Sequence, residues 1–393
     1  MMRNQYIILL TSLSLFMLSC KKESVAPPVN PQPTTAQFTV LSSGTSCSTT
    51  NSGVYVAGTA LNISNQVLVQ VNVTSTGTYS VASSNYYGMK FTGSGSFTAV
   101  GNQTIILSGT GTPAYAGNIS IPFSAGSTTC RLNIFVNPPS QGALLDNDHM
   151  LLGNPSNAGL IIDSSNNYLM RKTYYAVSYS KGRGTPNWVS WHLYAPDLGS
   201  IPRQDDFRPD GNLPPDWYFV SDNSYSGSGF DRGHNCPSGD RTSTVEANSS
   251  TFLMTNMIPQ APFHNQVPWA IMEDSLRRLV NAGNELYIIM GNYGTGGTGN
   301  NGFANTIDGG RITVPASVWK IAVVIPNGNN DISRIDGSIR LIAVDMPNTV
   351  SVNSNWKSYR TSVDAIETAT GYDLLNLLPA PVQALLESRI DNL

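Results

Sequence analysis

The sequence predicts two folded parts, an all-β sandwich over residues 38–138 and an α+β domain over residues 145–393. Two observations support this division. Short segments of alternating apolar and polar residues, separated by Gly, Ser and Asn, fill the first part. The second part combines strand-like runs with helical patterns, and it holds every Trp, every His and most of the charged residues. The stretch at residues 138–142, which contains Pro and Gly, marks the boundary between them.

Residues 1–20 are typical of an export signal. Arg3 supplies a positive charge, a mostly apolar run follows over residues 7–18, and Ser19 and Cys20 end it. A small residue followed by cysteine resembles the end of bacterial lipoprotein signal peptides, which are cut before a cysteine that carries the lipid. We therefore expect export and attachment through Cys20 to the bacterial outer membrane or cell surface. A plain secretory signal, giving a periplasmic or secreted protein, is the alternative.

A polar, proline-rich segment over residues 21–37 predicts a flexible tether. Beyond it, residues 67–73 alternate Val with Leu, Gln and Asn, which is the two-residue period of a β-strand. Repeated strands of this kind favour an immunoglobulin-like sandwich. Cys47 and Cys130 flank the region and could form a disulfide in an oxidising compartment, with two reduced, buried cysteines as the alternative. The region has no acidic residue and no histidine, so spacing or weak attachment is its expected role.

Past residue 140 the pattern mixes strands and helices. Strands are expected at residues 174–179, 188–193, 252–257, 285–290, 319–325 and 340–345, and helices at residues 268–281, 351–370 and 379–388. This mixture predicts the α+β class. The glycine-rich stretch at residues 291–302 lacks the Lys and hydroxyl residue of a phosphate-binding loop, so a mobile surface loop is expected there.

The stretch over residues 228–279 gathers the residue types that phosphodiester hydrolysis needs. The catalyst has to generate hydroxide, neutralise the phosphorane and stabilise the departing oxygen. A neutral histidine such as His234 suits the first task near pH 7. A divalent cation with oxygen ligands suits the others, and Asn265, Glu273 and Arg277 recur at multiples of four residues along one face of the expected helix. Each residue alone has a simpler explanation, a structural histidine or a surface ion pair. Their combination favours a metal-assisted site.

The motif Asp231-Arg232-Gly233-His234 resembles the DRGH signature of the DNA/RNA non-specific endonucleases of ββα-metal type, the family that includes endonuclease G-like enzymes. The resemblance covers roughly residues 145–390. Further residues match the order and spacing of the family, namely Pro237, Asp240, Arg241, Thr255, Asn256, Pro259, Gln260, Asn265, Trp269 and Glu273. The resemblance implies a ββα-metal nuclease domain with a mixed or antiparallel sheet.

The resemblance also implies which residues would activate water and hold the metal ion. His234 would be the general base, Asn265 the direct ligand of Mg²⁺, and Glu273 a ligand through a bound water molecule. Mn²⁺ could substitute for Mg²⁺. Asp231 would anchor the signature loop. The neighbouring His264 is expected to face away from the site, because successive residues of an extended chain point to opposite sides.

Several further residues would bind the substrate. Arg203 and Arg277 match arginines that stabilise the phosphorane in this family, with Arg208 as an alternative to the first. Arg232 would also contact the substrate, and Asn256 would support the catalytic site. The implied reaction is hydrolysis of DNA and RNA, single- or double-stranded and without sequence preference, to 5′-phosphate and 3′-hydroxyl products.

Charge qualifies this expectation. From residue 141 onward the chain has 17 Lys and Arg against 24 Asp and Glu, a net charge of −7. Because basic residues drive affinity for nucleic acids, weak and strongly salt-sensitive binding is expected.

Two other functions stay open. One is a surface-anchored binding or adhesion lipoprotein that keeps an inactive nuclease fold. The other is an enzyme acting on a small diester, such as an extracellular nucleotide.

Overall fold

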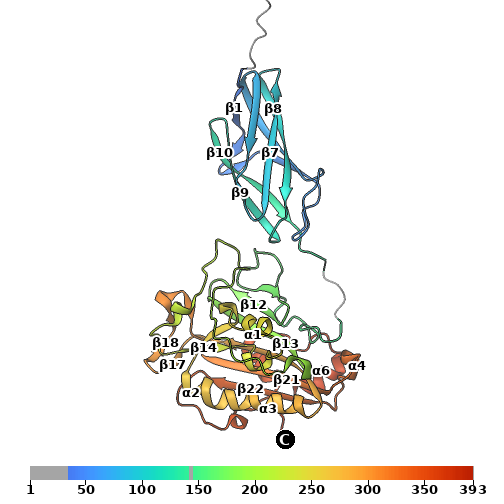
Figure 1. Cartoon of the computed structure of the whole chain (residues 1–393), viewed down its shortest axis with the longest axis vertical. Coiled ribbons are helices and arrows are strands. Elements are labelled where there is room, and N and C mark those ends of the chain that lie inside the picture. Colours follow the sequence, from blue (N-terminus) through green and yellow to red (C-terminus); the bar gives the residue numbers. More distant parts are fainter. Residues whose placement is uncertain (1–33, 141–144, 393) are drawn as a thin grey trace, which may run out of the picture.

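The computed structural model describes residues 34–140 and 145–392 of the 393-residue chain (Figure 1). The predicted signal peptide, Cys20 and most of the predicted tether lie outside the described residues. Strand β1 (Gln37–Val40) begins at the last residue of the predicted tether, and Thr35 already forms a bridge with Thr78. The β-structure therefore starts slightly earlier than predicted. Across the described ranges, no helix combines the length and apolar character needed to cross a bilayer.

The first part of the structure consists of strands only. They are β1, β2 (Ser42–Ser43), β3 (Ser46–Cys47), β4 (Thr49–Ser52), β5 (Gln66–Ser75), β6 (Gly77–Ala82), β7 (Met89–Phe97), β8 (Gly101–Gly111), β9 (Gly117–Ala125) and β10 (Thr128–Val136). One sheet has the order β1-β5-β8-β7-β6 with β4 beside β5, and the other has the order β2-β3-β10-β9.

The alternating pattern of this part has the predicted consequence. Val67, Val69 and Val71 on β5 are fully buried in a core that both sheets share, while the residues between them are less buried. Cys47 on β3 and Cys130 on β10 are joined by a disulfide, so the bridge weighed from sequence is present. It connects two positions 83 residues apart in the chain.

The two parts of the chain lie end to end (Figure 1), and they are linked by hydrogen bonds and by Ile162, which packs against the cores of both. The hydroxyl groups of Tyr86 and Tyr87 both donate to Oδ2 of Asp216, over 2.6 and 2.8 Å. The hydroxyl of Tyr115 donates to the carbonyl oxygen of Leu213, over 2.9 Å. The all-β part is therefore attached to the loop that leads into η2 (Asp222–Tyr225).

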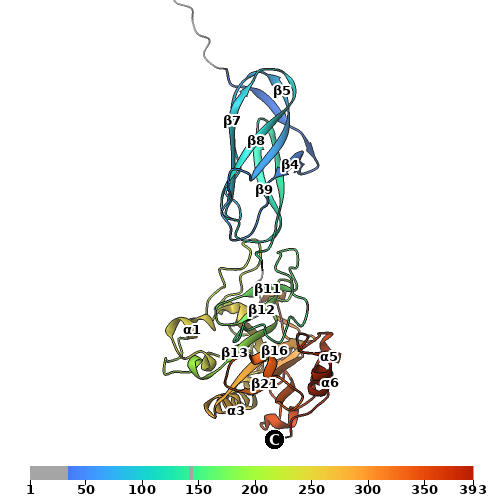
Figure 2. The same ribbon diagram turned by 90° about the vertical axis from the view of Figure 1, so that its right-hand side faces the viewer.

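The second part is built on one antiparallel sheet. Its strands, in spatial order, are β11 (Tyr168–Arg171), β12 (Ala176–Ser180), β13 (Thr185–Leu193), β16 (Asn284–Tyr293), β21 (Ser317–Pro326) and β22 (Arg340–Pro347). Helix α3 (Ala270–Asn281) covers one face, and α5 (Val363–Thr370) and α6 (Ala380–Glu387) lie on the other (Figure 2). The α+β class is confirmed, and the sheet is antiparallel throughout.

The pleat of β21 decides which side chains reach α3. Val318, Ala322 and Val324 pack in the core on the α3 side, whereas Trp319 and Ile321 pack in the core on the α5 and α6 side. Side chains alternate between the faces of a strand, so Lys320 points to the α3 side. This register places a buried cation next to the candidate site.

The signature stretch forms a two-stranded antiparallel sheet followed by helices. Strand β14 (Asp231–His234) pairs antiparallel with β15 (Met257–Gln260), so the DRGH motif lies on a strand as expected. The strand predicted at residues 252–257 is wrong for most of its length, because η4 (Met254–Asn256) precedes β15. The Asn256 amide donates to the carbonyl oxygens of Cys236 and Thr251, which holds the chain in a turn here.

Two other predictions also differ from the structure. Residues 291–302 do not form one surface loop, because β16 runs through Tyr293 and β17 (Gly297–Gly299) then pairs with β18 (Gly302–Ala304). The helix predicted at residues 351–370 begins only at Val363. The Ser362 side chain accepts the Ala365 N–H and caps α5 at that point. The helix predicted at residues 379–388 is confirmed as α6.

Short elements complete the fold. They are η1 (Ala195–Asp197), η3 (Ser238–Asp240), α1 (Val245–Ser250), β19 (Thr306–Ile307), η6 (Asp308–Gly310), β20 (Ile312–Thr313), α4 (Asp331–Arg334) and η7 (Trp356–Tyr359).

Candidate active site

A cavity of about 700 Å³ lies between β14, the first turns of α3 and two loops, around residues 203–207 and 222–230. Six of the seven residues predicted for the site line this cavity, namely Arg203, Arg232, His234, Asn265, Glu273 and Arg277. Residues that are as far apart as 203 and 277 in the sequence therefore meet at one surface, and the predicted grouping is reproduced by the fold.

His234 ends strand β14 and is 9% exposed. Its ring packs edge-on against Phe252, with 5.0 Å between the centroids, and it is tilted against Phe207. Atom Nε2 is buried and has no hydrogen-bond partner among the described residues. Burial, with the nearby charges of Arg203 and Arg232, lowers the pKa of His234 to about 3. The imidazole is therefore neutral at pH 7, which is the form that accepts a proton.

Asn265 is held in a fixed orientation by the signature motif. Its Nδ2 donates to Oδ2 of Asp231 over 2.8 Å, and Nε2 of Gln266 donates to the same oxygen over 2.9 Å. With the amide nitrogen used in this way, the amide oxygen is left for another partner. Asp231 thus does more than anchor its own strand, because it orients the residue predicted to bind the metal ion directly.

The backbone around Asn265 differs from the predicted helix. Helix α2 (Pro262–His264) starts before residue 268 and leads through the π-helical turn η5 (Asn265–Trp269) into α3. Pro268 lies inside η5 and has no N–H to donate, so the wider turn accommodates it. Asn265 and Glu273 belong to one continuous helical segment and line the same cavity.

Glu273 has an ion-pair partner that was not predicted. The Nζ of Lys320 donates to Oε1 of Glu273 over 2.9 Å, and the Lys320 side chain is 1% exposed. The ammonium also lies over the rings of Trp191 and Trp269, with 5.4 and 4.8 Å to their centroids. Burial raises the pKa of Glu273, and the positive charges of Lys320 and Arg277 act against that shift. A lone Lys in the apolar run of β21 was the sequence signal for this contact.

Arg203 and Arg232 are both paired and stacked at the cavity. Arg203 donates to Asp205 and, over 2.9 Å, to Oγ of Ser238, and its guanidinium lies 4.8 Å from the centroid of the Phe252 ring. Arg232 forms an ion pair with Asp222. These side-chain contacts hold positive charge beside His234.

Two more arginines were weighed for the site. Arg277 donates to Oδ1 of Asp240 over 2.8 Å and to Asp274 over 2.5 Å, so a substrate phosphate would have to share it with these carboxylates. Arg208 is paired with Asp206 and lies outside the lining of the cavity. Of the two candidates for the upstream arginine, Arg203 therefore lines the cavity and Arg208 does not.

Asn256 and His264 lie in the interior. Asn256 is fully buried, and besides its two donated bonds its side-chain oxygen accepts the N–H of Cys236. It supports the loop after His234 and does not line the cavity. Asn256 is therefore not placed to contact a substrate directly. His264 is also fully buried, packed edge-on against Trp269. It points away from the cavity as predicted, although it does so from helix α2 and not from an extended chain.

The donor groups of the cavity fit a hard divalent cation. An amide oxygen with its nitrogen already bonded and a carboxylate share the cavity, and oxygen is the ligand that Mg²⁺ prefers. Among the described residues, the groups of three His, Cys, Asp or Glu close enough to share an ion lie elsewhere. A metal ion in the cavity would consequently keep several water molecules, as Mg²⁺ usually does.

Comparisons with known proteins agree with this geometry. Residues 159–380 match the family model described as DNA/RNA non-specific endonuclease. A protein named "Nuclease" from Nostoc sp. is 46% identical over 244 residues, which cover 62% of this chain and 86% of that protein. Nuclease C1 of Cunninghamella echinulata is 28% identical over 222 residues, covering 54% of this chain and 86% of its own.

More distant relatives include the mitochondrial nuclease EXOG of Xenopus laevis. It is 26% identical over 204 residues, which cover 50% of this chain and 55% of that protein. A chain in a crystal structure of the EndoG/EndoGI complex aligns with 60% of this chain, at 23% identity and a TM-score of 0.49. From the family model and the Nostoc relative, this chain belongs to the DNA/RNA non-specific endonuclease family, and it is a nuclease by class.

Proposed function

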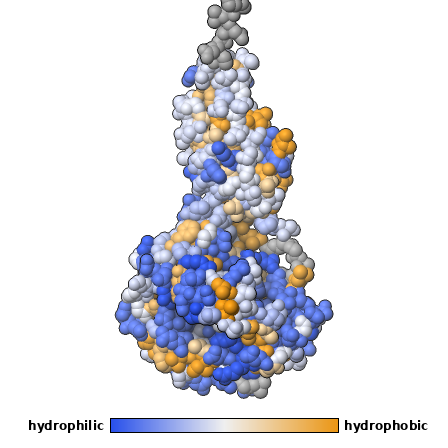
Figure 3. Space-filling model, viewed as in Figure 1, coloured by the Kyte–Doolittle hydropathy of each residue, from blue (hydrophilic) through white to orange (hydrophobic). Residues whose placement is uncertain are grey.

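We propose that this protein is a Mg²⁺-dependent endonuclease that hydrolyses both DNA and RNA to 5′-phosphate and 3′-hydroxyl products. The observation that carries the proposal is the cavity in which neutral His234, the oriented amide of Asn265 and the carboxylate of Glu273 come together. A binding protein has no need of a base and a metal ligand in the same cavity. The surface of the α+β part is also mainly hydrophilic in Figure 3, which suits a polar polymer.

His234 performs the first step. Its neutral ring accepts a proton from a water molecule as the water oxygen attacks phosphorus. The new P–O bond forms opposite the bond to the 3′-oxygen, which then breaks and leaves the phosphate on the 5′ side. The low pKa of His234 in the free protein comes from burial and from two arginines. A bound phosphodiester partly neutralises those arginines, so the ring becomes more basic once the substrate is in place.

The arginines and the metal ligands handle the negative charge. Arg203 and Arg232 flank His234 and donate forked hydrogen bonds to phosphate oxygens, and Arg277 adds positive charge from α3. Asn265 would hold Mg²⁺ directly and Glu273 through a water molecule, with Mn²⁺ as a possible substitute. When bound, the ion supplies charge that stabilises the phosphorane and the departing 3′-oxygen. The positive charge of Lys320 favours the ionised form of Glu273 for this task.

Substrate breadth follows from what the site contacts. The residues assigned to substrate bind phosphate, and phosphate contacts carry no sequence information. Single- and double-stranded DNA and RNA are therefore proposed substrates. Because the domain is acidic, binding is expected to weaken steeply as salt increases.

The test is digestion of plasmid DNA and of RNA by the purified protein, with Mg²⁺ or with EDTA, beside Asn265→Ala. Cleavage of both polymers that requires Mg²⁺ and is lost in Asn265→Ala is the expected result. A chromogenic small diester is assayed in parallel, because preference for it would identify the protein as an enzyme for small nucleotides. Absence of cleavage with every divalent cation would contradict the proposal and favour a binding or adhesion role.

We further propose that the protein is exported and anchored through a lipid on Cys20, ahead of a tether, an immunoglobulin-like spacer and the nuclease domain. The disulfide between Cys47 and Cys130 supports export, since such bonds persist in oxidising compartments. The junction at Asp216 would keep the spacer attached to the nuclease domain.

A further inference from the structure

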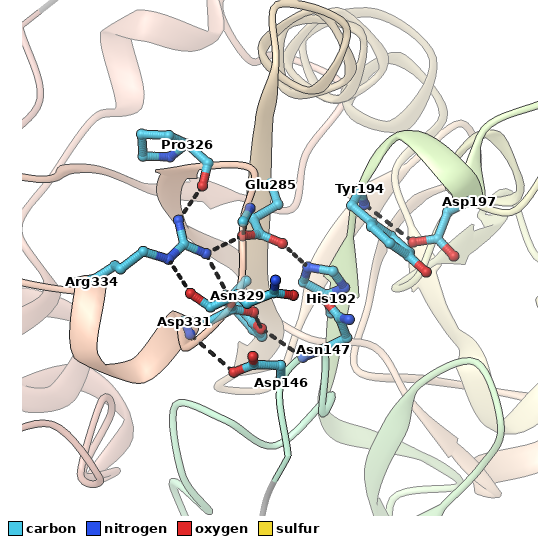
Figure 4. A network of polar contacts seen from close by, with 12 residues as sticks. Asp146, Asn147, His192, Tyr194, Asp197, Glu285, Pro326, Asn329, Asp331 and Arg334 are labelled. Carbon is cyan, nitrogen blue, oxygen red and sulfur yellow. Dashed lines mark hydrogen bonds and ion pairs between the residues drawn. The ribbon is translucent and has the colours of Figure 1, made fainter.

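Two clusters of acidic side chains lie outside the cavity, and they differ in how their charge is balanced. The first contains Glu285 and Asp331 with His192, all buried (Figure 4). Arg334 forms ion pairs with both carboxylates, and His192 lies 3.1 Å from Glu285. The hydroxyl of Tyr287 donates to Asp331. Arg334 thus supplies a counter-charge inside the network, and an added cation would have to displace Arg334.

The second cluster has no such balance. It consists of Asp364 and Glu367 on α5 and Glu387 at the end of α6. One carboxylate oxygen from each residue lies within 4.8 Å of the others. None of the three forms an ion pair with a Lys, Arg or His in the part of the chain that the structure describes. Three like charges therefore converge without a counter-charge.

Glu387 makes this imbalance costly. It is 8% exposed, and its Oε1 is buried with no hydrogen-bond partner among the described residues. A buried carboxylate oxygen without a partner is unfavourable. Burial and the charges of Glu367, Asp364 and Asp373 raise the pKa of Glu387 to about 7. A cation bound here would give the buried oxygen a partner and offset the three converging charges.

We propose that Asp364, Glu367 and Glu387 bind a divalent cation, and that Ca²⁺ fits best. The donors are carboxylate oxygens without His or Cys, which selects hard cations. Oxygens within 4.8 Å of one another need only a small inward shift to lie about 2.3–2.6 Å from one ion, the usual Ca²⁺ distance. Mg²⁺ requires shorter bonds in strict octahedral geometry. Asp364 is exposed, so the ion has a path from solvent and room for water ligands.

The ion would act on stability and not on catalysis. Helices α5 and α6 pack against the face of the sheet opposite to α3. Glu387 is the last residue of α6 and is buried, whereas Leu385 in the same turn is 60% exposed. A cation shared by α5 and α6 would fasten the C-terminal helix to the domain. The site is separate from the proposed catalytic metal, so each can be tested alone.

Thermal unfolding of the whole protein tests the proposal. The background is Asn265→Ala, which weakens the catalytic metal site and removes that contribution. At pH 8, Ca²⁺ at about 100 times its dissociation constant is expected to raise Tm by about 5 °C or more relative to EDTA. Mg²⁺ at the same concentration is expected to do much less.

Matched variants in the same background complete the design. Asp364→Asn and Glu387→Gln should each abolish most of the Ca²⁺ shift, and Asp364→Asn changes an exposed group and is expected to fold normally. Glu246→Gln, at an exposed position on α1, should leave the shift unchanged. Equal shifts in all three variants would overturn the proposal. So would the absence of any shift at pH 8.

Discussion

The ammonium of Lys320 on β21 lies 2.9 Å from the carboxylate of Glu273 on α3. A buried lysine of the sheet thus forms an ion pair with the carboxylate proposed to hold the hydrated metal ion. Two roles are joined in this pair. It balances a charge that burial disfavours, and it opposes the rise that burial causes in the pKa of Glu273, which lines the cavity.

Lys320→Met should therefore affect both stability and activity. Removing one partner of a buried pair leaves the other charge uncompensated, which costs about 3–5 kcal/mol. The pKa of Glu273 should rise further, so cleavage should be lost first on the acidic side of the pH profile. Urea unfolding and the pH dependence of cleavage measure the two effects.

The double variant Lys320→Met/Glu273→Gln is the matched control. It removes both charges, so it should recover much of the stability without recovering activity. If Lys320→Met unfolds at the same urea concentration as the wild type, the pair is not a stabilising contact.

His234→Ala should reduce cleavage by about 10²–10⁴-fold, the usual contribution of a positioned base. The fold should persist, because other residues support the loop after β14, Asn256 above all. The initial rate of DNA cleavage at saturating Mg²⁺ measures the effect. His264→Gln changes a buried histidine that does not line the cavity, and it should keep its activity wherever it folds. Near-normal cleavage by His234→Ala would remove this residue from the base role.

Acid should destabilise the protein below about pH 6.5. Burial lowers the pKa of His149 to about 4 and those of His192, His234 and His264 to about 3. The unfolded chain takes up protons as pH falls through about 6.5, whereas the folded chain does not, so the free energy of unfolding decreases. The loss is about 2 kcal/mol per histidine by about pH 5. The raised pKa values of Glu387 and of other carboxyls, namely Asp197, Glu273, Glu285 and Glu367, act in the opposite direction, so the contribution of the histidines is best isolated with a histidine variant.

Urea midpoints between pH 8 and pH 5 measure this dependence. In His264→Gln the decrease should be smaller by the share of one histidine, because one proton fewer is taken up on unfolding. A midpoint that stays constant down to pH 5 would contradict the neutral, buried state of these rings.

Cys20→Ser should release the protein from membranes. The lipid is proposed to attach at this thiol, and a serine cannot carry it through a thioether. Fractionation of the expressing bacteria, with the nuclease domain detected by antibody, measures the distribution. A variant that stays in the membrane fraction would refute lipidation at Cys20.

Much of the fold was readable because it depends on local periodicity. The alternation at Val67, Val69 and Val71 forms the buried face of β5, and strand β14 carries the DRGH motif as expected. Predictions failed where one side-chain contact overrides the local pattern. Asn256 turns the chain before β15, Ser362 delays the start of α5, and Pro268 is absorbed in a π-helical turn.

Motif order and spacing are properties of the chain, so they identified the class of protein and gave His234, Asn265 and Glu273 as candidate site residues. The orientation of these side chains and the electrostatic environment of each depend on the folded structure. Lys320 reaches Glu273 across 47 residues, and Asp231 reaches Asn265 across 34. Such contacts depend on the register of β21 and on the path of η5. Burial then sets the pKa of each group, and burial exists only once the sheet and its helices have packed.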